Sequence, residues 1–122
     1  MNFDFSEEQQ MIRQAAKDYA ERELIKDVLE RDAKAEIPWG HIKNLAELGF
    51  FGMTVDPKYG GGGMDTLSYI LAIEEISRID AAMGVILSVH NSLPCFGIQA
   101  YGSEEQKEKY LPDLASGRKI HP

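Results

Sequence analysis

The sequence contains a single cysteine, Cys95, and no cluster of histidines near it. One thiol cannot form an internal disulfide, and by itself it cannot hold a structural zinc ion. A reducing compartment is therefore expected. Basic residues are also scarce, since 13 Lys and Arg stand against 20 Asp and Glu and give a formal net charge of −7. This balance opposes non-specific binding to nucleic acid or to anionic lipid surfaces.

The chain also lacks the marks of an export signal or a membrane anchor. Its first ten residues, MNFDFSEEQQ, carry acids where a signal or transit peptide carries Lys or Arg. No apolar run approaches the roughly 20 residues that are needed to span a bilayer. We therefore expect a cytoplasmic protein that has neither a nucleic acid nor a membrane as partner.

Apolar residues recur at helical spacing along most of the 122 residues, a length that suffices for one core. The pattern predicts an all-α fold, an orthogonal or up-down bundle of about five helices. The first helix is expected from Ser6 to about Glu30. The others are expected at about 37–48, 65–79, 80–101 and 103–114, with a kink or limit at Pro94 because proline removes a helical hydrogen bond.

The helix starts carry recognisable capping residues. Ser6 with Gln9, and Ser103 with Gln106, have the form of a capping box, and Asp65 and Asp80 can cap the helices that follow them. The segment 50–55 is predicted to be an ordered apolar anchor that precedes the glycine run 60–63.

The glycine run raises the question of a phosphate site, because glycine-rich loops before a helix can bind phosphate through backbone amides. A dinucleotide fingerprint needs a third glycine three residues after the second, but those places hold Asp65 and Thr66. No lysine follows for a P-loop. A turn between helices is therefore favoured over a phosphate site.

Other chemistry-bearing residues point to structural roles. A carboxylate-bridged metal centre in a bundle needs Glu three residues before His, and the residues three before His41, His90 and His121 are Pro38, Leu87 and Arg118. No metal is expected.

Glu74 and Glu75 are adjacent carboxylates in an otherwise apolar helix. One of such a pair more often faces solvent while the other joins an ion pair, although a buried carboxylate can be tuned for acid or base work. Cys95 has no Lys or Arg within five residues on either side. We therefore expect a buried, inert thiol.

The segment between Ala81 and Leu93 contains no Lys, Arg, Asp or Glu, so protein is expected to surround this helix on most sides. Within it a mostly apolar stripe stands at helical spacing: Ile86, Val89, His90 and Leu93. The stripe favours ordinary core packing over the wall of an acyl pocket, and His90 favours a hydrogen-bonded core histidine over a lining residue. Composition leaves both alternatives open.

Three stretches resemble the acyl-CoA dehydrogenase family: the residues from His90 to Ile120, FSEEQQMIRQAAKDYAERELI, and LGFFGMTVDPKYGGGGMD. The match is to the N-terminal helical domain, and it is most similar to the short-chain, butyryl-CoA type. The resemblance implies that residues 1–122 form this domain, and that a middle β-domain and a C-terminal helical domain are absent from the chain. The ending KIHP departs from the family pattern.

The resemblance implies a flavin-dependent enzyme that oxidises a short-chain acyl-CoA to the trans-2-enoyl-CoA. In the family the catalytic glutamate and most FAD contacts lie in the other domains, so no catalytic or cofactor-binding residue is assigned here, and the chain alone is expected to be inactive without stably bound FAD. In the family the fourth helix of this domain supplies part of the wall of the acyl pocket, and the resemblance implies that this wall falls on Ile86, Val89, His90 and Leu93. The implied partners are acyl-CoA, an electron-transfer flavoprotein and further copies of the protein. The alternatives are a standalone helical interaction module or a fragment of an acyl-CoA oxidase.

Overall fold

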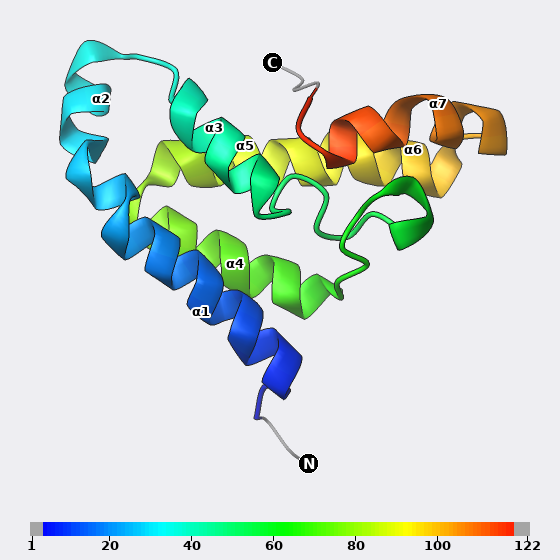
Figure 1. Cartoon of the computed structure of the whole chain (residues 1–122), viewed down its shortest axis with the longest axis horizontal. Coiled ribbons are helices and arrows are strands. Elements are labelled where there is room, and N and C mark those ends of the chain that lie inside the picture. Colours follow the sequence, from blue (N-terminus) through cyan, green and yellow to red (C-terminus); the bar gives the residue numbers. More distant parts are fainter. Residues whose placement is uncertain (1–3, 119–122) are drawn as a thin grey trace. The chain divides into compact units, whose positions relative to one another are not determined.

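The computed structural model of the protein describes residues 4–118 and divides the chain into two compact units. The first unit combines the residues up to 37 with residues 65–84, and the second combines residues 38–64 with those from 85 onward. Every regular element among the described residues is helical (Figure 1). The predicted all-α class is therefore confirmed.

The first unit is built on two long helices, α1 (Glu7–Arg22) and α4 (Thr66–Ile79), which lie side by side (Figure 1). Gln9 donates a hydrogen bond to Asp65 where both helices begin, and Arg78 pairs with Glu21 where both end. The two helices therefore run in the same direction. The same unit holds α2 (Val28–Lys34) and the start of α5 (Ala81–His90).

The first helix is shorter than the expected span of Ser6 to Glu30. It ends at Arg22 and passes through a 3-10 turn, Leu24–Lys26, before α2 begins. Arg31 explains the break, because its guanidinium reaches back to the carbonyl of Leu24 at 3.4 Å and pairs with the buried Asp80 at 2.8 Å. Apolar spacing along one helix carries no signal for such a distant partner.

The predicted capping residues are confirmed. Both capping boxes form. The hydroxyls of Ser6 and Ser103 accept from the amide of the third helical residue, and the side-chain oxygen of the glutamine at that place accepts from the amide of the capping serine. Asp65 accepts from the amide of Ser68, and Asp80 accepts from that of Met83. Each bond satisfies a donor that a helix start leaves free, typically contributing about 1 kcal/mol.

The second unit contains α3 (Trp39–Glu47), the later part of α5, α6 (Phe96–Tyr101) and α7 (Glu104–Ala115). Pro38 is the N-cap of α3 rather than a residue inside it. The predicted apolar anchor is confirmed, because its large side chains are almost fully buried: Phe50, Phe51, Met53 and Val55. These side chains are part of the unit's hydrophobic core.

The glycine run folds back onto the anchor instead of forming an open loop. The amides of Gly62, Gly63 and Met64 donate to the carbonyls of Gly52, Val55 and Met53 at 2.8–2.9 Å. A side chain on Gly61 would collide with Val55. The glycines are thus needed for close backbone approach, and the amides that a phosphate would require already have partners. The turn interpretation is confirmed.

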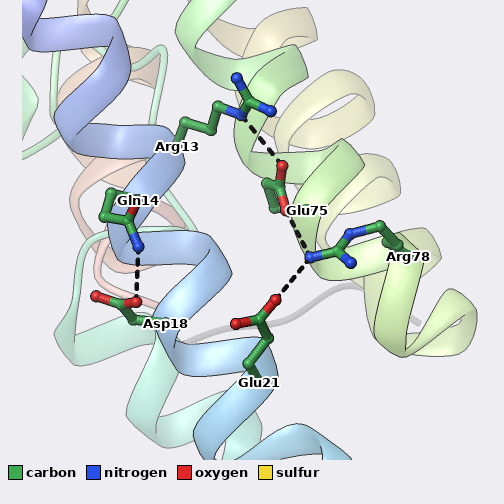
Figure 2. Close-up of polar contacts among 6 residues, drawn as sticks. All are labelled: Arg13, Gln14, Asp18, Glu21, Glu75 and Arg78. Atoms are coloured by element: carbon green, nitrogen blue, oxygen red, sulfur yellow. Dashed lines mark hydrogen bonds and ion pairs between the residues drawn. The ribbon is translucent and has the colours of Figure 1, made fainter.

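Glu75 is the buried member of the carboxylate pair, and Glu74 is exposed. Figure 2 shows Glu75 between two arginines from neighbouring helices, with Arg13 at 3.1 Å and Arg78 at 3.1 Å. Burial alone raises the pKa of Glu75, but the hydrogen bonds and charges of the two arginines outweigh it and hold that pKa below its ordinary value. Glu75 therefore stays ionised and acts as an ion-pair residue joining α1 to α4.

We expect Gly61→Ala to destabilise the protein by about 2 kcal/mol, because the new methyl group overlaps the backbone of Val55. Gly40→Ala is the matched control, since nothing lies within 4 Å of the added methyl in α3 and a helical glycine gains about 0.5–1 kcal/mol on this change. Urea unfolding followed by circular dichroism measures both. Equal stability of the two variants would contradict the close approach.

We expect Glu75→Gln to lower the free energy of unfolding at pH 7 by about 2 kcal/mol, less than for a fully buried pair because both arginines are half exposed. Since the folded pKa is depressed, the stabilisation is complete above the unfolded pKa and disappears as the pH falls through the folded pKa. The difference from wild type should therefore shrink below about pH 4.5. Glu74→Gln, the same change at an exposed neighbour, should alter stability by at most about 0.5 kcal/mol at every pH. Parallel pH profiles of the two variants would contradict the role of Glu75.

Candidate functional site

The charge-free part of the sequence forms one continuous helical run of 21 residues, Ala81–Tyr101. By length and composition alone this run is apolar enough to cross a membrane, and about a third of its most apolar stretch is buried inside the protein. It matches the helix expected at about 80–101, but it corrects the expectation that no apolar run approaches the roughly 20 residues of a membrane span. The core helix of a soluble protein passes the same test, so a single run of this kind is weak evidence for a membrane span.

The run has a buried side and an exposed side within the second unit. Leu87, Cys95 and the two polar residues His90 and Asn91 are almost fully buried. On the other side Val85, Leu93 and Phe96 are 61%, 65% and 54% exposed. Apolar side chains this exposed and this close along one helix form a surface to which another molecule or polypeptide can bind. We call these three residues the exposed face.

The predicted stripe is divided between these two sides. Leu93 belongs to the exposed face, and Ile86 and Val89 are half-buried. His90 is only 1% exposed. The structure therefore leaves Ile86, Val89 and Leu93 partly or largely exposed, whereas His90 is buried. Val85 and Phe96 were missing from the sequence-based set, although both are apolar and lie within the same helical run.

His90 is held as a core residue. Its Nε2 atom lies 2.7 Å from the carbonyl oxygen of Leu114 in α7, and its ring meets that of Phe51 edge to face, with centroids 5.0 Å apart. The hydrogen-bonded interpretation of this histidine is confirmed.

The helix passes Pro94 through a π turn, Asn91–Cys95. Proline has no amide hydrogen, so a regular α-helix would lose a bond at this position. The wider turn accommodates the loss, since the amide of Phe96 donates to the carbonyl of Asn91, five residues back. In place of the predicted kink or limit, Pro94 lies in a local widening of the helix, after which α6 continues to Tyr101 and ends at Gly102.

Asn91 links the start of this turn to the apolar anchor. Its Oδ1 accepts from the amide of Met53 at 3.1 Å, and its Nδ2 donates to the carbonyls of Phe50 and Leu87, both at 2.9 Å. Sequence reasoning missed this residue. The available signal was a polar amide within an otherwise apolar span, where burial requires that its hydrogen bonds be satisfied.

Cys95 lies on the buried side, and burial raises the pKa of its thiol to about 12. Its Sγ lies 3.7 Å from the carbonyl oxygen of Phe51. Because the thiolate is the reactive form, this thiol is inert near neutral pH. The expected buried and unreactive cysteine is confirmed.

Within residues 4–118 no group of three or more His, Cys, Asp or Glu is arranged to hold a metal ion. His121 and the ending KIHP lie outside the described residues. The arrangement in the second unit therefore offers an apolar binding surface supported by buried polar residues, rather than a metal centre or a nucleophile.

Comparison with known proteins identifies relatives that are longer than this chain. A short-chain specific acyl-CoA dehydrogenase from Clostridium acetobutylicum is 42% identical over 120 residues, which cover 98% of this chain and 32% of that protein. An acyl-CoA dehydrogenase from Bacillus subtilis is 47% identical over 112 residues, covering 92% and 30%. The chain thus spans about a third of the length of these relatives.

Solved structures show the same likeness in three dimensions. Butyryl-CoA dehydrogenase from Megasphaera elsdenii superposes with a TM-score of 0.92 at 41% identity, covering 98% of this chain and 32% of that one. A chain from a structure of the electron transferring flavoprotein of Acidaminococcus fermentans gives a TM-score of 0.94 at 42% identity, with the same coverage. The expected resemblance to the short-chain, butyryl-CoA type is confirmed.

The family "Acyl-CoA dehydrogenase, N-terminal domain" matches residues 6–118, which include nearly every described residue of both units. The helices, the capping residues and the uncharged run all fall within this match. The chain therefore belongs to the acyl-CoA dehydrogenase family as its N-terminal helical domain.

Proposed function

We propose that this chain is the N-terminal part of a flavin-dependent dehydrogenase that oxidises a short-chain acyl-CoA to the trans-2-enoyl-CoA. The observation that carries the proposal is the family match over residues 6–118. The names of the relatives favour a short acyl chain, since one is a short-chain specific enzyme and another a butyryl-CoA dehydrogenase. The exposed face supports the same function, because an apolar helix surface suits an apolar acyl tail.

The role proposed for this chain is to supply one wall of the acyl pocket, formed by Ile86, Val89 and Leu93, with the buried His90 holding the same helix to Leu114 of α7. Their half-buried or exposed apolar side chains support this role. Each methylene that a dry pocket accommodates contributes about 0.8 kcal/mol of burial. The volume of these side chains would therefore set the acyl length that the enzyme accepts.

The catalytic base and the FAD site are proposed to lie in the part of the enzyme that this chain does not include. Both oxygens of Glu75 are paired, Oε1 with Arg13 and Oε2 with Arg78, and its lowered pKa makes this carboxylate a weak base toward a substrate proton. The amides of the glycine run are bonded to carbonyls of the anchor, so this loop does not fit the phosphates of FAD. The described residues therefore offer no evident cradle for the flavin.

An electron-transfer flavoprotein and further copies of the enzyme are the proposed protein partners. The resemblance to a chain from a structure of an electron transferring flavoprotein supports the first of these. The alternative function, a standalone helical module that binds a partner helix, is favoured only by the exposed face itself. An oxidase origin has less support, since the relatives described above are named dehydrogenases.

The acyl wall can be tested in a fusion in which this chain replaces the matching residues of the Clostridium acetobutylicum enzyme. We expect Val89→Ala to shift relative kcat/KM toward longer acyl groups between C4 and C8, by about fourfold for each methylene that enters the freed space. Val28→Ala is the matched control, because Val28 is also half-buried but lies on α2. Unchanged relative kcat/KM in the Val89→Ala fusion would refute the wall.

The proposal that FAD and the catalytic base are held outside this chain is tested by an absorbance spectrum of the purified 122-residue chain with an acyl-CoA titration. We expect no flavin band and therefore no bleaching, because the residues that would hold FAD lie elsewhere in the enzyme. The fusion protein is the positive control and should be yellow and bleach on titration. A yellow 122-residue chain that bleaches with acyl-CoA would show that this part of the enzyme is sufficient by itself.

A further inference from the structure

Asn91 occupies an unusual position at the centre of the second unit. It is only 2% exposed, yet it satisfies three backbone groups through one side chain: the amide of Met53 and the carbonyls of Phe50 and Leu87. A buried amide bonded in this way ties the helix to the anchor at a fixed rotation, because a turn of the helix about its axis would leave both anchor partners, Met53 and Phe50, unpaired.

The π turn begins at this same residue. The carbonyl of Asn91 accepts from the amide of Phe96, while its side chain holds the preceding turn through Leu87. Pro94 cannot contribute an amide hydrogen to the turn. The direction of Leu93 inside the turn, and of Phe96 just after it, therefore depends on how the helix is held at Asn91.

We infer that Asn91 is a positioning residue for acyl-length selectivity: through the π turn it fixes Leu93 relative to Val89 and so sets the depth of the acyl wall. This inference rests on the proposed function. Asn91 is buried behind the wall and acts through Leu93, with no contact to substrate of its own. A substitution of Asn91 should therefore change the ratio of kcat/KM between acyl chains of different length, and should not lower kcat/KM equally for all of them.

Gln99 provides a matched control within the same unit. It too bridges the helical run to the segment around the anchor, since its Oε1 accepts from the amide of Asp56 at 2.7 Å and its Nε2 donates to the carbonyl of Thr54 at 3.1 Å. Gln99 lies in α6, beyond the π turn and beyond Leu93. Loss of its hydrogen bonds should weaken the attachment of α6 to this segment without changing the direction of Leu93.

The test compares Asn91→Asp with Gln99→Glu in the fusion enzyme described above, because both changes replace an amide by a carboxylate of the same shape. Asn91→Asp removes the donors to Phe50 and Leu87, and we expect the ratio of kcat/KM for C8 to that for C4 to change at least threefold. Gln99→Glu should leave the ratio within twofold of wild type. An equal loss for both substrates in the Asn91→Asp enzyme would overturn the inference, since it would reveal a role in stability alone.

A milder variant covers the case in which Asn91→Asp does not fold. Asn91→Ser can keep a bond to the carbonyl of Leu87, as Ser92 already does to that of Ser88 at 2.6 Å, but it loses Met53 and Phe50. We expect it to shift the C8 to C4 ratio in the same direction as Asn91→Asp, together with faster amide hydrogen exchange at Phe96. A folded Asn91→Ser enzyme with the wild-type ratio would overturn the inference.

The Val89→Ala enzyme separates failure of this inference from failure of the proposed function. If Val89→Ala shifts the ratio and the Asn91 variants do not, the acyl wall stands and the positioning role is wrong. If neither shifts the ratio, the acyl wall itself is wrong. A shift in both, without one in Gln99→Glu, is the result that the geometry predicts.

Discussion

The structure depends on how a helical run without charges is held in place by buried hydrogen bonds. Apolar contacts alone do not fix the rotation of such a helix, because its own side chains carry no charge on any face and each face could be buried. Asn91 and His90 fix the rotation, Asn91 through its hydrogen bonds to Phe50 and Met53 and His90 through its hydrogen bond to Leu114. With these residues inside, Val85, Leu93 and Phe96 are left on the surface. Buried polar groups thus determine which apolar side chains remain available to bind.

The first unit uses ionic contacts for a comparable purpose. Glu75 joins α1 to α4 through Arg13 and Arg78, and Asp80 both caps α5 and pairs with Arg31. The buried carboxylates Glu75 and Asp80 therefore stabilise the packing of helices through ion pairs. This structural role agrees with the proposal that the chemistry belongs to the part of the enzyme outside this chain.

The sequence predicted those elements that depend on contacts between near neighbours in the chain. The capping residues Ser6, Asp65, Asp80 and Ser103 were identified because a cap and its partner lie within three residues of each other. The break after α1 was missed because its cause, Arg31 bonded to Leu24 and Asp80, is a tertiary contact. The burial of His90 was predicted, but the separation of His90 from the exposed Leu93 was missed for a different reason. In a uniformly apolar span helical periodicity cannot say which side is buried, and a π turn changes the period itself.

The central claim is that the exposed face of the uncharged helix meets something beyond this polypeptide. Hydroxyl-radical footprinting with mass spectrometry tests it directly, by comparing the isolated chain with the fusion enzyme saturated with butyryl-CoA. The account predicts that Leu93 and Phe96 are oxidised readily in the isolated chain and are protected in the fusion, while the buried Leu87 stays protected in both. Equal oxidation of Leu93 and Phe96 in the two samples would contradict it.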